Sequence, residues 1–456
     1  MSPTSWRAII VFTALTVAVA ACGNSGSDNA ATTTTARADS STTAAGADQR
    51  DTFKPISGVP GVTDKEISYA VVGTRTNNPL GTCILDCYLD GIKAYFAFRN
   101  AEGGIFGRQL VVGQELDDEL GQNQQRALEI TSGTKAFGAF QATLVASGWG
   151  DLDAAGVPTY TWGINAAEAA NRQDIFPSIA IRCADCTGRA VPYAISVAGA
   201  KHAASIGYGV SENSKVCTNT VADSIRMYSA DIGADVAYVN DNLSFGLSNG
   251  IGPEVTAMKK AGVDFIATCI DLNGMKKLAQ ELQRQGMQDV VLYHPNTYNQ
   301  TFVKEAGGIF DGDFVSVQFL PFEADTKGTA LGDFLSWMNK QGSEPSELAM
   351  IGWINASLAF DGLLAAGPDF DRAKVTAATN AMTDFSAGGL IEPIDWTVAH
   401  TPYTQATRSV DTGKECTALV RVEKESFATV APKSRPWLCW PQADTSWAEP
   451  VATSFG

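Results

Sequence analysis

Alternating strand-like and helix-like segments limit what this chain can fold into more than any other feature. An apolar run ended by glycine at residues 65–73 is followed by an amphipathic helical pattern at 88–100, and strand-like runs recur at 109–115, 136–140 and 157–161. Parallel strands joined by crossover helices are typical of doubly wound α/β sheets. The first part of the chain therefore predicts a doubly wound lobe.

The same alternation restarts further along the chain, with strand-like runs at 202–210, 234–240, 263–269 and 289–293. We therefore expect an α/β protein with two doubly wound parallel-sheet lobes, joined by a hinge, and a ligand cleft between them. The expected organisation places the first part of lobe 1 at 51–182, lobe 2 at 183–317, a return to lobe 1 at 318–391, and a β-rich closing segment across the hinge at 392–456.

The N-terminus has the pattern of an export signal. One positive charge, Arg7, precedes an apolar run over residues 8–21, and small residues lead to Cys22. The run is too short to span a bilayer permanently, so we expect a signal peptide at 1–21. Val19-Ala20-Ala21-Cys22 also resembles a bacterial lipobox, which predicts lipidation of Cys22. An ordinary signal peptide with an incidental cysteine is the alternative.

The segment at 22–50 is expected to be a lipidated cysteine and a disordered tether. It is rich in Ser, Thr and Ala and has no large apolar residue, so it cannot bury enough surface to order itself. As a flexible coil it would span roughly 30 Å. The predicted location is therefore the outer face of the bacterial cell membrane.

Overall charge excludes one class of partner. The 49 acidic and 33 basic residues give a net charge of −16. A protein that neutralises nucleic-acid phosphates needs a basic face, so we expect no nucleic-acid partner.

Eight cysteines follow Cys22, and an even number in an exported chain predicts disulfides. Eight cysteines allow 105 pairings. Spacing suggests Cys83–Cys87, Cys183–Cys186 and Cys416–Cys439, which leaves Cys217–Cys269. A 2-1-3-4 strand order would also bring Cys217 and Cys269 to one edge of lobe 2. The alternative for the C-x-x-C at 183–186 is a metal or redox site, although none of the three histidines lies near a second C-x-x-C.

Sequence patterns of catalysis give no enzyme class. The chain has neither the H-E-x-x-H motif of metalloproteases nor a P-loop. The acidic run at 117–119 has no spaced oxygen partners for a calcium ion, so we interpret it as a solvated strand end. We expect no enzyme, no cofactor and no metal.

Ligands of open α/β sheets bind outside the carboxyl ends of the strands. The segments after the expected strands carry hydroxyls, amides and aromatic rings with few charges, which suits a small polar or amphipathic solute. Helix capping is the alternative role for each residue. The candidate ligand-binding residues are Gln141, Ala142, Thr143, Thr161, Trp162, Gly163, Asn213, His294, Asn296 and Tyr298.

Four stretches carry a resemblance to a known family, at 67–73, 100–107, 260–265 and 392–396. The second reads N-A-E-G-G-I-F-G and matches the family's N-A-x-G-G-I-x-G turn. On these residues the chain resembles the ABC-transporter substrate-binding lipoproteins of the branched-chain amino-acid type. The resemblance implies the type I periplasmic-binding-protein fold, whose lobes close on a solute.

The resemblance also implies roles for some of the candidate residues. It places the carboxylate of an amino acid against 141–143 and 161–163. The family's acidic residue for the ammonium falls on Asn296, and an amide cannot neutralise an ammonium as a carboxylate can. The ligand hypotheses are therefore a branched-chain amino acid, an amide, a urea-like molecule or an aromatic acid, with Trp162 and Tyr298 as stacking surfaces.

The functional hypothesis is an extracytoplasmic solute receptor of an ABC importer. Its expected partners are a small solute, a membrane permease with its ATPase, and the membrane through the lipid anchor, and we expect a monomer. The alternatives are a ligand-sensing surface lipoprotein on the same fold and an exported thiol-redox enzyme that uses Cys183 and Cys186.

Overall fold

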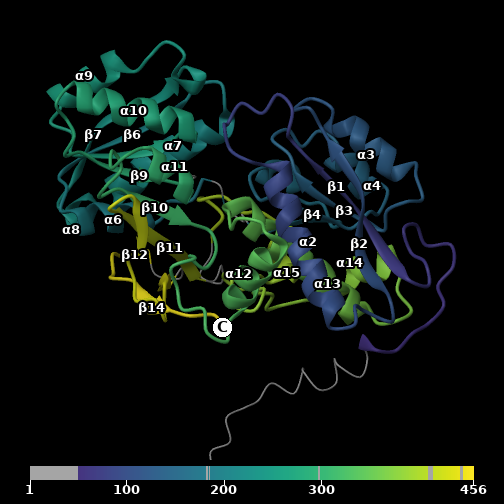
Figure 1. The fold of residues 1–456 in the computed structure, drawn as a ribbon. Helices are drawn as coiled ribbons and strands as arrows, with labels where there is room; N and C mark the ends of the chain where they lie inside the picture. Colours follow the sequence, from purple (N-terminus) through teal and green to yellow (C-terminus); the bar gives the residue numbers. More distant parts are fainter. Residues whose placement is uncertain (1–49, 181–182, 184, 296–297, 409–413, 442–444) are drawn as a thin grey trace, which may run out of the picture. The chain divides into compact units, whose positions relative to one another are not determined.

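The computed structural model describes residues 50–180, 183, 185–295, 298–408, 414–441 and 445–456 (Figure 1). The predicted signal peptide, Cys22 and the tether up to residue 49 lie outside the described residues. The described chain forms two sheets, with helices packed against their faces.

Lobe 1 is built on a parallel sheet with strand order β2-β1-β3-β4-β5. Its strands are β1 (Glu66–Gly73), β2 (Gln109–Asp117), β3 (Gly138–Ala142), β4 (Thr159–Thr161) and β5 (Ile175–Pro177). The helices between them are α2 (Leu85–Ala101), α3 (Asn123–Thr131), α4 (Trp149–Ala154) and α5 (Ala166–Ala169). The chain returns to this lobe in α12 (Ala330–Gln341), α13 (Glu347–Ala366), α14 (Arg372–Asn380) and α15 (Trp396–Ala399).

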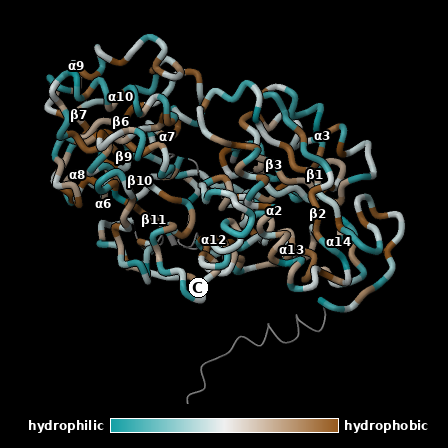
Figure 2. The backbone as a smooth tube through the Cα atoms, viewed as in Figure 1, coloured by the Kyte–Doolittle hydropathy of each residue, from teal (hydrophilic) through white to brown (hydrophobic). Residues whose placement is uncertain are grey.

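Alternate residues of β1, which lies between β2 and β3, enter two different cores. Tyr69 and Val71 lie in the core that contains α2 and α13, whereas Ala70 and Val72 lie in the core with α3 and α4. This period of two is the geometry of a strand buried on both faces. Figure 2 shows hydrophobic residues along the strands and along α13. The predicted doubly wound sheet is confirmed.

Lobe 2 repeats this arrangement in the parallel order β7-β6-β8-β9-β10. Its parallel strands are β6 (His202–Tyr208), β7 (Asp235–Leu243), β8 (Phe265–Cys269), β9 (Val291–His294) and β10 (Phe314–Val317). Its helices are α6 (Ala190–Ala198), α7 (Glu212–Met227), α8 (Ser229–Ile232), η1 (Phe245–Leu247), α9 (Gly252–Lys260), α10 (Leu272–Arg284) and α11 (Gln300–Glu305).

The C-terminal strands extend the sheet of lobe 2 beyond β10. β11 pairs antiparallel with β10, and β13 and β14 continue the sheet while β12 pairs with β11. Their bounds are β11 (Lys414–Glu423), β12 (Ser426–Thr429), β13 (Trp437–Pro441) and β14 (Val451–Thr453). The described strands of the expected closing segment therefore belong to lobe 2.

The structure forms the four disulfides that spacing and strand order suggested. Cys416 and Cys439 are register partners on β11 and β13, and Cys217–Cys269 joins α7 to the end of β8. The four pairs are Cys83–Cys87, Cys183–Cys186, Cys217–Cys269 and Cys416–Cys439.

Helix α13 is the most deeply buried helical element of lobe 1. Its length and composition would allow it to cross a membrane, but 83% of its most apolar window is buried inside the protein, as in a core helix. Ser346 caps its N-terminus by accepting a hydrogen bond from the Ala349 N–H. Glycines bring α13 very close to α2: a Cβ added to Gly91 would lie 1.7 Å from Ala349 O, and one added to Gly352 would lie 2.2 Å from Tyr88 O.

Replacement of Gly91 by alanine is expected to destabilise lobe 1, because the added methyl group would force α2 and α13 apart. Overpacking of this kind typically costs about 1–3 kcal/mol. Urea unfolding followed by circular dichroism measures the change. Gly121→Ala is the matched control, since a Cβ there meets nothing within 4 Å. Equal stability of the two variants would contradict the close helix contact.

Candidate functional site

The sheet of lobe 1 has a topological switch point between β1 and β3. The chain leaves β1 for α2 on one face of the sheet, and it leaves β2 and β3 for α3 and α4 on the other face. Connections that diverge in this way open a crevice at the carboxyl ends of the strands. Thr74 follows β1 and Thr143 follows β3, and both are buried. This edge is the candidate site in lobe 1.

Gln141, the penultimate residue of β3, faces α3 and positions the loop before α4. Its Oε1 accepts a hydrogen bond from Asn123 Nδ2 at 2.9 Å, and Asn123 Oδ1 accepts one from the Gly148 N–H at 2.8 Å. Its amide nitrogen is buried and has no partner. Gln141 therefore supports the candidate site from beneath, and a direct contact with a solute stays a prediction.

Thr161, Trp162 and Gly163 lie beside the end of β3. Thr161 is the register partner of Gln141, and the Trp162 N–H donates to Gln141 O at 2.8 Å. The structure thus brings together the predicted residues Gln141, Ala142, Thr143, Thr161, Trp162 and Gly163. The hydroxyls of Thr143 and Thr161 are buried without partners, and the Trp162 side chain is buried at 8% exposure.

The interpretation of residues 117–119 as a solvated strand end is wrong for its central residue. Asp118 is fully buried at 0% exposure, directly after β2. Asp117 fixes the loop after β1 instead. Burial raises the pKa of Asp117, but hydrogen bonds from the Thr76 hydroxyl and from the backbone N–H groups of Glu119, Arg75 and Thr76 outweigh it and lower the pKa to about 2. Sequence alone did not separate the two neighbours, because their burial is set by the tertiary fold.

In lobe 2, the predicted residues fall in three different environments. Asn213, in the first turn of α7, is exposed, and its Nδ2 donates to Ile164 O at 3.2 Å, in the loop after β4. His294 is buried at the end of β9, with its Nε2 3.0 Å from Asp313 Oδ2. Asn296 lies outside the described residues. The structure gives His294 an internal partner, so its contact with a solute stays a prediction.

Tyr298 lies in an aromatic cluster of the protein. Its ring centroid is 4.9 Å from that of Phe427 and 5.1 Å from that of Phe322. Its hydroxyl donates to Glu323 Oε2 at 2.5 Å and accepts from the Phe322 N–H at 2.7 Å. The ring and the hydroxyl of Tyr298 are therefore both in contact with neighbouring protein groups. Stacking of Tyr298 on a solute would require these groups to move.

The carboxyl edge of lobe 2 also carries an acidic residue outside the candidate set. Tyr208, the last residue of β6, donates to Asp271 Oδ1, which also accepts from the Gly274 N–H at 3.2 Å. Asp271 Oδ2 is buried without a partner. The sequence places Asp271 directly after a strand, and in the structure Asp271 caps the N-terminus of α10.

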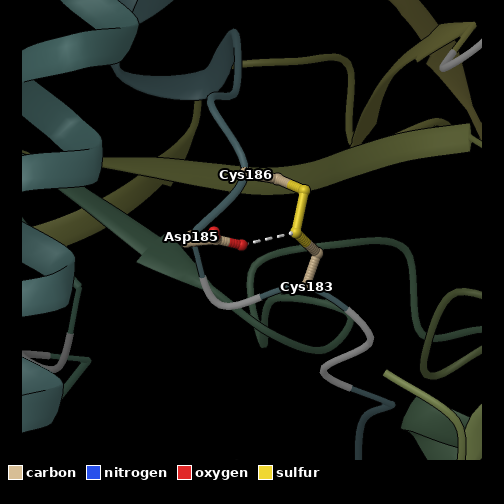
Figure 3. Close-up of side chains that lie close together, drawn as sticks. All are labelled: Cys183, Asp185 and Cys186. Carbon is tan, nitrogen blue, oxygen red and sulfur yellow. Dashed lines mark hydrogen bonds between the residues drawn. A yellow bond between two sulfur atoms is a disulfide. The ribbon is translucent and has the colours of Figure 1, made fainter. Parts of the chain in front are cut away.

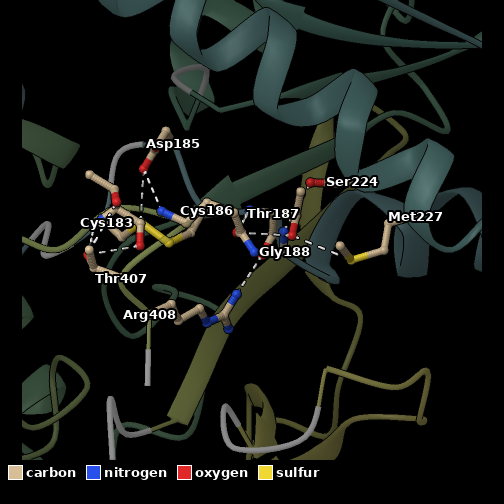
Figure 4. Close-up of a disulfide and its surroundings, with 11 residues drawn as sticks. Cys183, Asp185, Cys186, Thr187, Gly188, Ser224, Met227, Thr407 and Arg408 are labelled. Atoms are coloured by element: carbon tan, nitrogen blue, oxygen red, sulfur yellow. Dashed lines mark hydrogen bonds between the residues drawn. A yellow bond between two sulfur atoms is a disulfide. The ribbon is translucent and has the colours of Figure 1, made fainter. Parts of the chain in front are cut away.

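The C-x-x-C segment is not an open metal site. Cys183, Asp185 and Cys186 form the metal-like cluster found among the described residues, but the two sulfurs are bonded to each other (Figure 3). Asp185 Oδ1 accepts from the Gln405 N–H at 3.1 Å, and Arg408 Nη1 donates to Thr187 O at 3.0 Å. The disulfide thus sits where the segment leading into α6 meets residues 405–408 (Figure 4), a structural position.

A small cavity lies beside Gly163, with a volume of about 20 Å³. Its lining includes Pro177, Ile179 and His400. This volume is close to that of one water molecule. A larger hollow of about 430 Å³ lies at the amino ends of the lobe 1 strands, lined by residues such as Val59, Thr63 and Lys135, on the opposite edge from Thr74 and Thr143.

A family model described as periplasmic binding protein matches residues 83–424. The chain belongs to the periplasmic binding protein family. The resemblance seen in the sequence is confirmed, and so is the predicted type I fold. No curated protein sequence matches this periplasmic binding protein.

Solved structures share the fold of this binding protein at low identity. LivJ from Streptococcus pneumoniae, in complex with isoleucine, is 15% identical with a TM-score of 0.62, over 80% of this chain and 99% of that chain. A branched-chain amino acid ABC transporter from Thermus thermophilus with bound valine is 15% identical with a TM-score of 0.61, over 86% of this chain and 97% of that chain. A fatty acid ABC transporter substrate-binding protein from Thermomonospora curvata is 17% identical with a TM-score of 0.59, over 88% of this chain and 98% of that chain.

His400 makes the stability of this binding protein sensitive to acid. The ring packs against Phe176 and Trp396, and its Nε2 lies 2.7 Å from Asn380 Oδ1. Burial lowers the pKa of His400 to about 4, below its ordinary value of 6.5. The native state therefore resists the protonation that the unfolded state accepts.

We expect the contribution of His400 to the free energy of unfolding to be fully present above pH 6.5. It should be lost as the pH falls towards 4, which lowers the free energy of unfolding by up to about 3 kcal/mol. His400→Gln keeps a hydrogen-bond donor and should flatten this decline in urea-unfolding free energy between pH 7 and 4. The exposed His202→Gln variant is the control. A decline equally steep in wild type and His400→Gln would refute the assignment.

Proposed function

We propose that this protein is an extracytoplasmic solute receptor of an ABC importer. It captures a small polar or amphipathic solute by closure of its two lobes and delivers the solute to a membrane permease with its ATPase. It acts as a receptor rather than as an enzyme, and as a monomer. Membership of the periplasmic binding protein family is the main support for this proposal.

The carboxyl edge of lobe 1 is the observation that carries the binding role. Buried hydroxyls of Thr143 and Thr161 without partners lie beside the switch point, where ligands of such sheets bind. Buried polar groups are normally hydrogen-bonded, so unpaired ones at this position suit a solute that supplies the partners. Trp162, which follows Thr161, is a largely buried aromatic residue of the same loop, and we propose that its ring contributes apolar contacts to the solute.

Structural neighbours support a solute of this general size. One was solved with isoleucine and one with valine, and another is named for fatty acids. We propose a branched-chain amino acid, an amide or a related compound as the class to be screened. Lipidation of Cys22 would hold the receptor at the outer face of the membrane, and residues 22–50 would provide the reach for docking.

Trp162→Ala is expected to weaken solute binding at least tenfold, because it removes the main apolar surface beside Thr143 and Thr161. Isothermal titration calorimetry measures this with the tightest solute found in a thermal-shift screen of amino acids, amides and carboxylic acids. Since a buried Trp→Ala change also costs stability, Trp162→Phe is measured alongside it. Trp337→Phe is the control, because it makes the same substitution on α12, outside the candidate site.

An unchanged affinity in both Trp162 variants would exclude this edge as the binding site. The absence of any stabilising solute in the screen would count against the receptor function itself.

A further inference from the structure

Asp118 is a buried carboxylate with one oxygen left free. Its backbone is fixed, because its N–H donates to Gly73 O at 3.0 Å and its carbonyl accepts from the Gln122 N–H at 2.6 Å. Oδ1 accepts from the Leu120 N–H at 3.0 Å, whereas Oδ2 is buried and has no hydrogen-bond partner in the part of the chain that the structure describes.

No basic side chain among the described residues forms an ion pair with Asp118. Arg126, the cation that lowers the pKa of Asp118, is engaged with Glu119, Glu129 and the Asp117 carbonyl. Burial raises the pKa of Asp118, and the Thr74 hydroxyl lowers it through a hydrogen bond. A buried carboxylate oxygen without a donor is costly, so a donor from a bound solute or water would stabilise it.

Asp118 lies at the carboxyl end of β2, at the same edge of the sheet as Thr74 and Thr143. Thr74, which interacts with the carboxylate, also accepts a hydrogen bond from the Leu144 N–H at 3.2 Å. Thr143, the residue before Leu144, has a buried hydroxyl without a partner at 1% exposure. Thr74 therefore links the Asp118 carboxylate to the loop that carries the Thr143 hydroxyl, at the carboxyl edge of the sheet.

We propose that Asp118 and Thr143 select solutes that present an N–H donor group, and that they reject a free carboxylate at this point of the site. A carboxamide or urea group fits both side chains: its N–H donates to Asp118 Oδ2 and its carbonyl accepts from the Thr143 hydroxyl. An ammonium also donates to the carboxylate. A carboxylate would bring a second negative charge beside a buried one. This inference rests on the proposed receptor function.

The test compares solutes that differ only in this group. Dissociation constants are measured by calorimetry for propionamide against propionate, benzamide against benzoate, and leucinamide against leucine, with propylamine as the ammonium probe. Wild type is expected to bind the amide about 10- to 100-fold more tightly than the acid in any pair that binds. Tighter binding of propylamine than of propionamide would assign the ammonium as the donor group.

Asp118→Asn is expected to abolish or reverse this preference, because an asparagine can itself donate to a carboxylate. Asp174→Asn is the matched control: burial also raises the pKa of Asp174, but Asp174 precedes β5 at the opposite edge of the sheet. Thr143→Val is a second variant, which should weaken amides more than propylamine and keeps the test informative if Asp118→Asn does not fold.

Three results would overturn the inference. These are tighter binding of the acids by wild type, an unchanged preference in Asp118→Asn, and a screen in which the tight solute has no N–H group. If the screen gives another N–H solute, Asp118→Asn must weaken it at least tenfold, and an unchanged affinity would also overturn the inference. The receptor function survives each of these results, because it fails only if no solute binds at all.

Discussion

The strand order of lobe 1 is the constraint on which the rest of the structure depends. Because β1 lies between β2 and β3, and its crossover runs to the face opposite those that follow β2 and β3, the chain separates at the carboxyl ends of β1 and β3. Side chains from three consecutive strand–loop junctions, Thr74, Asp118 and Thr143, then meet at one edge although they lie far apart in the sequence. A parallel sheet buried on both faces gives the rigid support that such a site needs.

Polar groups at this edge are held by the protein without being fully satisfied by it. Gln141 and Asn123 fix the loop before α4 through hydrogen bonds, while Thr143, Thr161 and Asp118 keep atoms without partners. Unpaired buried groups lower stability, and proteins retain them mainly where a ligand or water completes the network. The tight packing of α2 on α13 supplies stability elsewhere in the same lobe.

Sequence patterns predicted the fold class from periodic burial, which is a local property. Short cysteine spacings suggested three disulfide pairs, and Cys217–Cys269 was the remaining pair, consistent with a 2-1-3-4 strand order in lobe 2. The family resemblance placed the loops after β3 and β4 at one site, and the structure shows that they are neighbours. Sequence patterns missed the burial of Asp118, because its acidic neighbours indicated exposure to solvent. They also predicted that the Tyr298 ring is available for stacking on a solute, whereas in the structure this ring packs against Phe322 and Phe427. Burial of a single loop residue depends on which distant segment covers it, and periodicity carries no information on that.

The sequence by itself determined that two doubly wound lobes would form and that their strand ends would carry polar side chains, since apolar periodicity and chain connectivity leave few other folds. Only the tertiary structure decided which of those side chains are satisfied internally. His294 pairs with Asp313, and the Tyr298 hydroxyl donates a hydrogen bond to Glu323. Asp118 and Thr143 each keep one buried oxygen atom without a hydrogen-bond partner among the described residues. The reason is that hydrogen-bond partners come from strands and loops distant in sequence, and they meet only after the sheet has assembled.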